Sequence, residues 1–253
     1  IERDHPELDS PDSPTHRVGG APIEGFTTVQ HRIPMLSIDN EYDEAGVREF
    51  DQRVRKTLGV ESVDYTVEYK IDGVAVAIIY EQGRLVQAVT RGDGRQGDDV
   101  THNVRPMRSV PTQLVVDRRA HQEERSVAEA LAQADRIEIR GEIFIANRDF
   151  AQIRSQQQER GEAPFANSRN AASGALKLLD PVESARRKLR FFAHGIGDRA
   201  GIEFESHLQF LSALRACGVP TTPRVERRSG IDATLEWCSH LMEGLHELDF
   251  EVD

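Results

Sequence analysis

The first regular pattern in the chain is a set of apolar residues three or four positions apart. This spacing is typical of one face of an amphipathic helix. The expected helix begins after Asn40, as its N-cap, and ends at Gly59. Its apolar stripe consists of Val47, Phe50, Val54 and Leu58.

From Tyr65 onward the apolar period shortens towards two, which predicts strands. The expected strands cover residues 65–71, 74–80, 85–90, 136–145 and 189–196. The second and third of these are joined by Gln82 and Gly83, a typical signal for a two-residue hairpin turn.

Further helices are expected at 147–160, 168–179, 206–217 and 232–246. Ser206 and Gln209 form a capping-box pattern, and Gly218 stands where a glycine commonly ends a helix. Residues 117–135 are polar and rich in alanine, so we expect a surface insertion there. Hairpin strands with helices between them predict an α+β fold with antiparallel sheets rather than a parallel doubly wound sheet.

Composition narrows the class of protein without identifying it. The 253 residues are 38% hydrophobic and 30% charged, enough for one large domain or two small ones. A net charge of −11 argues against a generally basic nucleic-acid-binding surface, although a local basic patch is still compatible with it. Cys217 and Cys238 lack metal-ligand spacing, which favours free thiols and a cytoplasmic protein. We find no signal-peptide pattern and no apolar run of membrane-spanning length.

The main candidate for chemistry is the hexapeptide Glu68-Tyr69-Lys70-Ile71-Asp72-Gly73. In an extended strand its three charged side chains share a face. A lysine amine can act as a nucleophile once it loses its proton and its electrophile is held in line. The alternative is a solvated strand face with cross-strand ion pairs.

Residues 90–99 form a second candidate, a glycine-rich acidic loop. The loop lacks the spacing of a phosphate-binding P-loop, and no helix clearly begins after it. The spacing of an EF-hand calcium loop is absent as well. A turn-rich loop is therefore the plain alternative.

Together the motifs resemble the adenylation domain of NAD-dependent bacterial DNA ligases. The hexapeptide is similar to the K-x-D-G motif of nucleotidyltransferases, with Lys70 as its lysine. The other matching blocks follow in order at residues 34–40, 90–105, 140–144, 165–174, 189–194 and 249–253.

The resemblance implies a nucleotidyltransferase (ATP-grasp-like) fold. Residues 1–36 would be a linker and the tail of an N-terminal subdomain that binds the nicotinamide mononucleotide half of NAD. Residues 37–253 would be the adenylation domain, cut off within its fourth motif. We therefore expect a fragment of a longer protein, one that does not adenylate itself appreciably with NAD alone.

The resemblance also implies a reaction. Lys70 would attack the α-phosphate of NAD, form a lysyl-AMP bond and pass AMP to the 5′-phosphate of nicked double-stranded DNA. Asp72 would orient Lys70 or hold a metal. Mg²⁺ is the expected metal ion, with Asp253 as a ligand, and the ligase is expected to be a monomer without membrane contacts.

Roles in binding the adenylate carry over from the family to individual positions. Glu68 would accept a hydrogen bond from the adenine amino group, and Glu142 would contact the ribose, unless it is an ordinary surface strand residue. The remaining pocket residues would be Ser37, Ile38, Arg91 and His194.

Two cations, Arg169 and Lys177, stand where the family contacts DNA phosphates. They are eight positions apart on an expected helix and would share a face, although such a pair is commonly just solvated. A basic cluster follows at Arg186, Arg187, Lys188 and Arg190.

The chain departs from the family at two places within its length. His194 stands where many relatives have a tyrosine stacked on adenine, and a core histidine bonded to backbone is the alternative. The arginine and proline usual before the fourth motif are replaced in 245–249. A second function thus stays open: a degenerate adenylation-like module that binds AMP or nicked DNA without catalysis.

Overall fold

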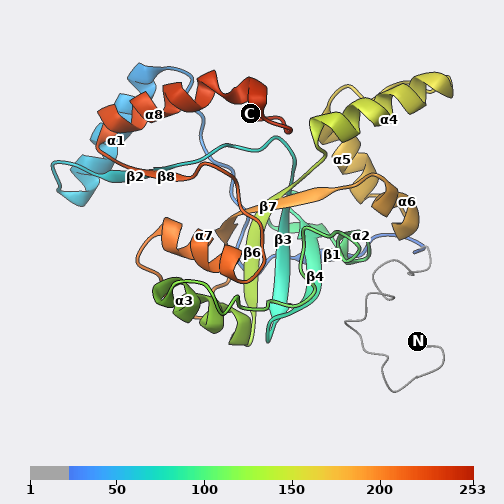
Figure 1. Cartoon of the computed structure of the whole chain (residues 1–253), viewed down its shortest axis with the longest axis horizontal. Helices are drawn as coiled ribbons and strands as arrows, with labels where there is room; N and C mark the ends of the chain where they lie inside the picture. The colour runs from blue at the N-terminus through green and yellow to red at the C-terminus, as the bar shows by residue number, and fades with distance from the viewer. Residues whose placement is uncertain (1–22) are drawn as a thin grey trace.

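A four-stranded antiparallel sheet forms the centre of the protein (Figure 1). The computed structural model describes residues 23–253, so most of the expected linker and subdomain tail at 1–36 lies outside the described residues. Strand order in the sheet is β4-β3-β6-β7. The strands are β3 (Val74–Glu81), β4 (Arg84–Thr90), β6 (Ile137–Phe144) and β7 (Arg190–Ile196).

Two smaller antiparallel sheets accompany the central one. One pairs β1 (Thr28–Gln30) with β5 (Gln96–Asp98), and the other pairs β2 (Asp64–Val67) with β8 (Glu226–Ser229). The α+β class with antiparallel sheets is therefore confirmed. The turn between β3 and β4 is also as expected, since Gln82 and Gly83 both have positive φ angles, 47° and 73°.

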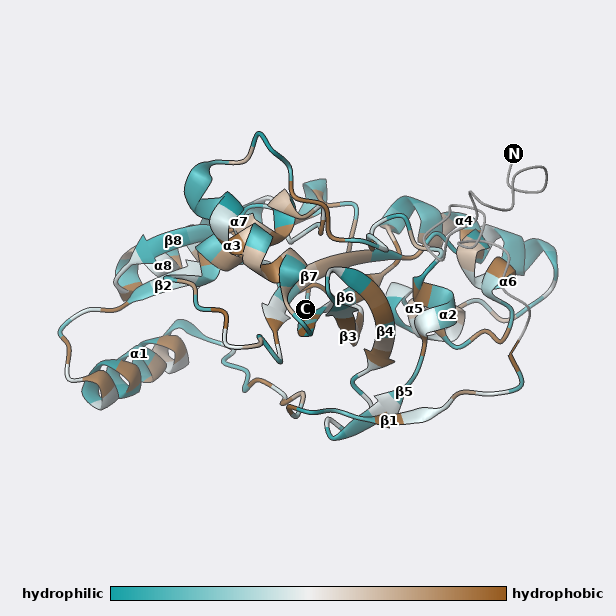
Figure 2. Cartoon of the chain, turned by 90° about the horizontal axis from the view of Figure 1, so that it is seen from below, coloured by the Kyte–Doolittle hydropathy of each residue, from teal (hydrophilic) through white to brown (hydrophobic). Residues whose placement is uncertain are grey.

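Alternation along the strands gives the central sheet two different faces. Val76, Ile78 and Tyr80 point into the main apolar core, whereas Ala77 and Ile79 point to the opposite face. Helices cover the core face, and Figure 2 shows apolar strands at the centre of the molecule. The helices that contribute buried residues to this core are α2 (Thr101–Val104), α3 (Gln122–Gln133), α4 (Asn147–Glu159), α5 (Ser168–Leu176) and α7 (His207–Ala216).

The region expected as a surface insertion is part of this core. Helix α3 packs against α7, and its Ala128 and Leu131 side chains are fully buried. The prediction for 117–135 was therefore wrong, because its polar residues form only the outer face of an amphipathic helix. Helix α6 (Pro181–Arg186) was not predicted.

Helices α1 (Glu44–Leu58) and α8 (Ile231–Glu243) lie with β2 and β8 at one end of the molecule (Figure 1). The N-cap of α1 is Asp43, not Asn40, because the Asp43 carboxylate accepts the amide hydrogen of Gly46 at 2.8 Å. The helix ends at Gly59 as expected, with φ at 68°. A short 3₁₀ turn (Leu245–Glu247) follows α8, so the expected helix at 232–246 was too long.

Several other predicted boundaries are off by one residue, and two are off by more: the strand expected at 65–71 ends at Val67, and the helix expected at 168–179 ends at Leu176. The short helix α2 begins two residues after the glycine-rich loop, where no helix was expected. The cap of α7 is confirmed, since the Ser206 hydroxyl accepts the Gln209 amide hydrogen at 3.2 Å. Cys217 and Cys238 are free thiols.

The glycine-rich loop folds back closely on the end of β4. A Cβ atom at Gly97 would lie 1.7 Å from the Thr90 carbonyl oxygen, so only glycine fits there without backbone movement. The Asp98 amide also donates to the Thr90 hydroxyl at 3.0 Å. The loop is thus fixed to the sheet by contacts of its own backbone.

We predict that Gly97→Ala lowers the free energy of unfolding by at least about 2 kcal/mol, because the methyl group would force the backbone apart. Gly25→Ala is the matched control, since a Cβ there meets no atom within 4 Å. It should change stability by less than about 0.5 kcal/mol. Urea denaturation of both variants tests this, and equal stabilities would contradict it.

Candidate functional site

The sheet face opposite the core forms the floor of a cavity. Strand alternation places Arg140 and Glu142 of β6 on this face, together with Phe192 and His194 of β7. Ala75, which pairs with Glu142, is small and leaves space above the sheet. The resulting cavity has a volume of about 640 Å³.

The segment at 35–38 forms one wall of this cavity. The Arg140 guanidinium donates hydrogen bonds to the carbonyl oxygens of Ile33 and Pro34 at 2.5 and 3.1 Å. Met35 is buried against the sheet, and its amide donates to the Gly94 carbonyl at 2.8 Å. These contacts bring Ser37 and Ile38 to the cavity, where the structure places both among its lining residues.

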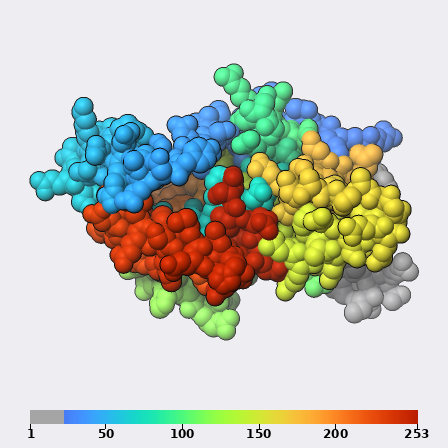
Figure 3. Space-filling view, turned by 90° about the horizontal axis from the view of Figure 1, so that it is seen from above, coloured from blue at the N-terminus to red at the C-terminus, as the bar shows by residue number. Residues whose placement is uncertain are grey.

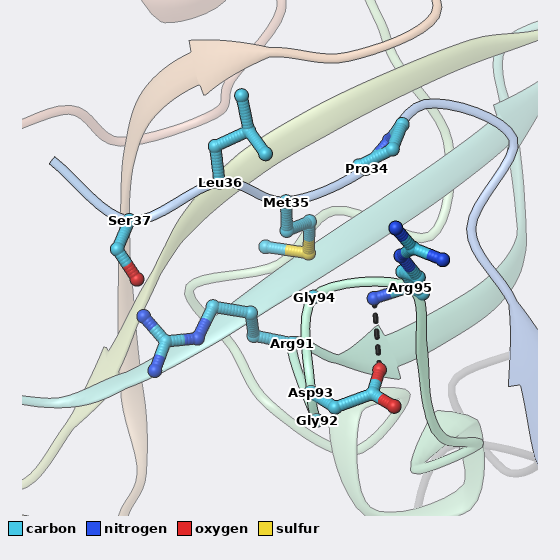
Figure 4. Close-up of a pocket in the computed structure, with 9 residues that line it drawn as sticks. All are labelled: Pro34, Met35, Leu36, Ser37, Arg91, Gly92, Asp93, Gly94 and Arg95. Carbon is cyan, nitrogen blue, oxygen red and sulfur yellow. Dashed lines mark hydrogen bonds between the residues drawn. The ribbon is translucent and has the colours of Figure 1, made fainter.

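A smaller cavity of about 360 Å³ adjoins the first, between residues 34–37 and the loop at 91–95. Figure 4 shows the Ser37 hydroxyl and the Arg91 guanidinium pointing toward each other, and Arg91 lines both cavities. Asp93 closes the loop by accepting the backbone hydrogens of Gln96 and Arg95, each at 2.9 Å. These hydrogen bonds lower the pKa of Asp93. The loop is turn-rich, as the plain alternative proposed.

Lys70 lies at the wall of the main cavity, between two buried neighbours. Tyr69 and Ile71 pack into an apolar cluster, while the Lys70 side chain is 43% exposed and forms an ion pair with Asp253. This contact lowers the pKa of Asp253. Lys70 is thus held by a distant carboxylate, not by the acidic residues that flank it in sequence.

A short backbone pairing joins the hexapeptide to the C-terminal segment. Ile71 forms an antiparallel bridge with Val252, and the amide of Asp253 donates to the Lys70 carbonyl at 2.9 Å. Phe250 packs edge-on against Tyr69, with ring centroids 6.1 Å apart. Figure 3 shows the C-terminal residues, in red, between the blue region around α1 and the yellow helices.

The three charged residues of the hexapeptide have separate partners. Glu68 and Lys70 line the main cavity, as their shared face predicted. Asp72 does not line it. Its carboxylate lies 3.1 Å from the guanidinium of Arg169, which does.

Glu142 is the most perturbed carboxyl group of the cavity. Burial raises its pKa to about 7, although Arg169, Lys70 and Arg91 act in the opposite direction. Its Oε2 atom is buried and has no hydrogen-bond partner. Glu142 is thus not an ordinary surface glutamate, and its oxygen can still accept a hydrogen bond.

His194 lies in the cavity and not in the core. Its side chain is 42% exposed, and its Nε2 atom is 4.0 Å from a Glu142 oxygen. Partial burial in the cavity lowers its pKa below the ordinary value. The core-histidine alternative is therefore excluded by its position.

Glu68 has a neighbour that the sequence did not reveal. The Nε2 atom of His207 lies 3.4 Å from one Glu68 oxygen, and the other oxygen is buried without a hydrogen-bond partner. His207 is the first residue of α7. The Ser206 capping pattern predicted that helix start, but not that it would lie beside Glu68.

The two expected phosphate-binding cations line one depression of about 270 Å³, together with Arg91. Arg169 is on α5 and Lys177 is its C-cap residue, whose amide still donates to the Ser173 carbonyl at 3.2 Å. The two side chains line the depression together with Ser173, so they share a helical face as expected. Lys177 is 3.0 Å from an Asp98 oxygen. Both cations are therefore paired with acidic groups, Arg169 with Asp72 and Lys177 with Asp98.

The basic cluster after α6 is partly neutralised. Asp149 is buried and lies 2.9 Å from both Lys188 and Arg190. Burial alone would raise the pKa of Asp149, but these two cations hold it below its ordinary value. Arg186 and Arg187 also line a separate surface pocket of about 310 Å³.

The described residues contain no complete metal site made by protein alone. Among residues 23–253, no three His, Cys, Asp or Glu side chains are grouped to hold a metal ion. In the same part of the chain, none of the helices combines the length and apolarity needed to cross a membrane.

Comparisons with known proteins support the resemblance seen in the sequence motifs. Residues 23–253 match the family model for the NAD-dependent DNA ligase adenylation domain. Over its whole length the chain is 46% identical to a DNA ligase of Alkalilimnicola ehrlichii, 42% to one of Rhodopirellula baltica and 43% to one of Halorhodospira halophila. It spans 34–35% of the length of these relatives.

The raised pKa of Glu142 predicts how the stability of the protein depends on pH. Between about pH 4.5 and 7 the Glu142 carboxyl group loses its proton in the unfolded chain and keeps it in the folded chain. Its stabilising contribution is therefore lost as pH rises. We expect the free energy of unfolding of wild type, relative to Glu142→Gln, to fall by up to about 3 kcal/mol from pH 4.5 to 8.

Urea denaturation across this pH range measures the difference. Glu243→Gln is the control, because Glu243 is exposed near the end of α8. Its difference from wild type should stay constant. A pH-independent difference for Glu142→Gln would contradict the prediction.

Proposed function

Because the chain belongs to the family of NAD-dependent DNA ligase adenylation domains, we propose that its main cavity binds adenylate and that Lys70 carries the AMP group. The observation that carries this proposal is the position of Lys70 at the wall of a cavity that Glu68 and Glu142 also line. A nucleotidyltransferase fold would account for this arrangement. The chain covers about a third of its relatives, so nick sealing is proposed for the longer protein.

Lys70 would act as the nucleophile. Its neutral amine attacks the α-phosphorus of NAD, a phosphorus–nitrogen bond forms, and nicotinamide mononucleotide leaves with the electron pair of the broken phosphoanhydride bond. The 5′-phosphate of the nick then displaces Lys70 and takes AMP. Finally the 3′-hydroxyl attacks that phosphate and AMP leaves, which closes the phosphodiester bond.

The cavity walls would orient the nucleotide. Glu68 has unused acceptor capacity for an amino group, and the partnerless oxygen of Glu142 suits a ribose hydroxyl. His194 would stack on the base, with less contact area than a tyrosine offers. Ser37, Ile38 and Arg91 would close the remaining side.

Asp253 would control when Lys70 can react. The ion pair holds the Lys70 amine against the Asp253 carboxylate, so Asp253 must release Lys70 before attack. Asp253, which contacts Lys70, and Asp72, two positions after Lys70 in the chain, would supply hard oxygen donors for Mg²⁺. When bound, this ion neutralises phosphate charge.

The same ion pair is the one observation that favours the second function, nucleotide binding without catalysis. In the structure the Lys70 amine contacts a carboxylate, which is not its reactive arrangement. Formation of a lysine adduct separates the two functions. We also propose a monomeric state and a cytoplasmic location, and both rest on membership of the family alone.

We predict that the full-length protein forms an AMP adduct on Lys70 with NAD and Mg²⁺, and that Lys70→Ala abolishes it. Intact-mass and peptide mass spectrometry measure the adduct. Lys56→Ala, an exposed lysine at the end of α1, is the control and should keep the adduct. The present chain alone should form no appreciable adduct, and an adduct on another lysine would refute the assignment.

We also predict that Arg169→Ala and Lys177→Ala each weaken binding of the full-length protein to nicked DNA. Each variant should reduce the slope of log affinity against log salt concentration by about one, the change expected when one phosphate contact is lost. Arg119→Ala removes an equal charge at a side chain that is 90% exposed and pairs with nearby Asp117. Fluorescence anisotropy at several salt concentrations tests this, and equal slopes for all three variants would contradict it.

A further inference from the structure

We propose that His207 is a positioning residue that holds the Glu68 carboxylate, so that the cavity selects a 6-aminopurine over a 6-oxopurine. This inference rests on the proposed function of the cavity as an adenylate site. It assigns a role to a residue outside the cavity lining, since His207 is not among the residues that form its walls. His207 would therefore act on the nucleotide only through Glu68.

The imidazole of His207 is fixed by the start of α7. The Ser206 hydroxyl caps this helix, and the Gln209 side-chain oxygen accepts the backbone hydrogen of Glu205 at 2.7 Å. The His207 ring also packs against Phe210, with centroids 6.1 Å apart, and Phe210 is fully buried. The ring is thus anchored independently of Glu68.

Glu68 needs such an anchor more than a shorter acid would. The torsion that turns a glutamate carboxylate is broad, so an isolated carboxylate presents its oxygens in many directions. Here Glu68 follows the end of β2, and His207 Nε2 lies 3.4 Å from its Oε1 atom. At this distance a protonated imidazole forms an ion pair with the carboxylate. The contact restricts the orientation of the carboxylate plane.

A restricted carboxylate discriminates between purines by hydrogen-bond polarity. Glu68 is three-quarters buried, and its Oε2 atom has no partner. An exocyclic amino group donates to such an acceptor, whereas a 6-oxo group places a second acceptor against it. A site built to bond one group rejects an analogue that lacks it, and a mobile carboxylate would reject it less.

Two variants separate the bonding role of His207 from its packing role. His207→Phe keeps an aromatic ring against Phe210 and removes the nitrogen beside Glu68. His207→Gln keeps an N–H donor and removes the ring. His246→Ala is a control that removes an exposed imidazole, one that contacts the Glu243 carbonyl.

Isothermal titration calorimetry of this chain with AMP and with IMP supplies the measurement, and thermal unfolding checks each variant. We expect wild type, His207→Gln and His246→Ala to prefer AMP by about tenfold or more. In His207→Phe the preference should fall to about threefold or less, mainly through weaker AMP binding.

Each outcome bears on a different part of the argument. An unchanged preference in a folded His207→Phe variant overturns the role of His207 and leaves the proposed function intact. Equal losses for AMP and IMP show a purely structural role and overturn the inference as well. If wild type binds neither nucleotide, the adenylate site itself is refuted, and the inference is refuted with it.

Discussion

The pairing of β6 between β3 and β7 is the constraint on which the site depends. This register places Ile137 and Ile139 in the core and Arg140 and Glu142 on the opposite face. Because side chains alternate, a slip of one residue would bury the charged pair and expose the isoleucines. Gly141 permits the arrangement, since a Cβ atom there would lie 2.2 Å from the Phe192 carbonyl oxygen.

That register also explains why the cavity carries polar atoms with unmet hydrogen-bonding capacity. Arg140 is occupied by Glu138 and by the carbonyl oxygens of the segment at 33–34. Glu142 lies farther along the same strand and keeps one buried oxygen unpaired, as Glu68 does. A protein that maximised stability alone would not leave two such oxygens in one cavity. Their arrangement is what a donor-rich ligand would complete.

Short sequence patterns correctly predicted the turn and the helix cap that depend only on neighbouring residues. The β3–β4 turn and the Ser206 cap follow from residues next to each other in the chain. The N-cap of α1 was misplaced because both Asn40 and Asp43 can cap, and only the fold selects Asp43. The polar segment 117–135 was misjudged because its two core contacts depend on where α7 lies.

The candidate site was predictable as far as the family motifs reach. Glu68, Lys70 and Glu142 were named from motifs, and the structure brings them to one cavity. His207 lies outside the matching blocks, and the block at 140–144 did not reveal that Arg140 fixes the segment at 33–34. Such contacts join residues far apart in sequence, so no periodicity or short pattern reports them.

The bridge between Ile71 and Val252 has a consequence for the synthesis of the protein. Lys70 leaves the ribosome 183 positions ahead of Asp253, the carboxylate that holds it. Until residues 250–253 emerge, Tyr69 and Ile71 lack part of their apolar cover, and Lys70 lacks its carboxylate partner. The surroundings of Lys70 are therefore completed only after all four strands of the central sheet have been synthesised.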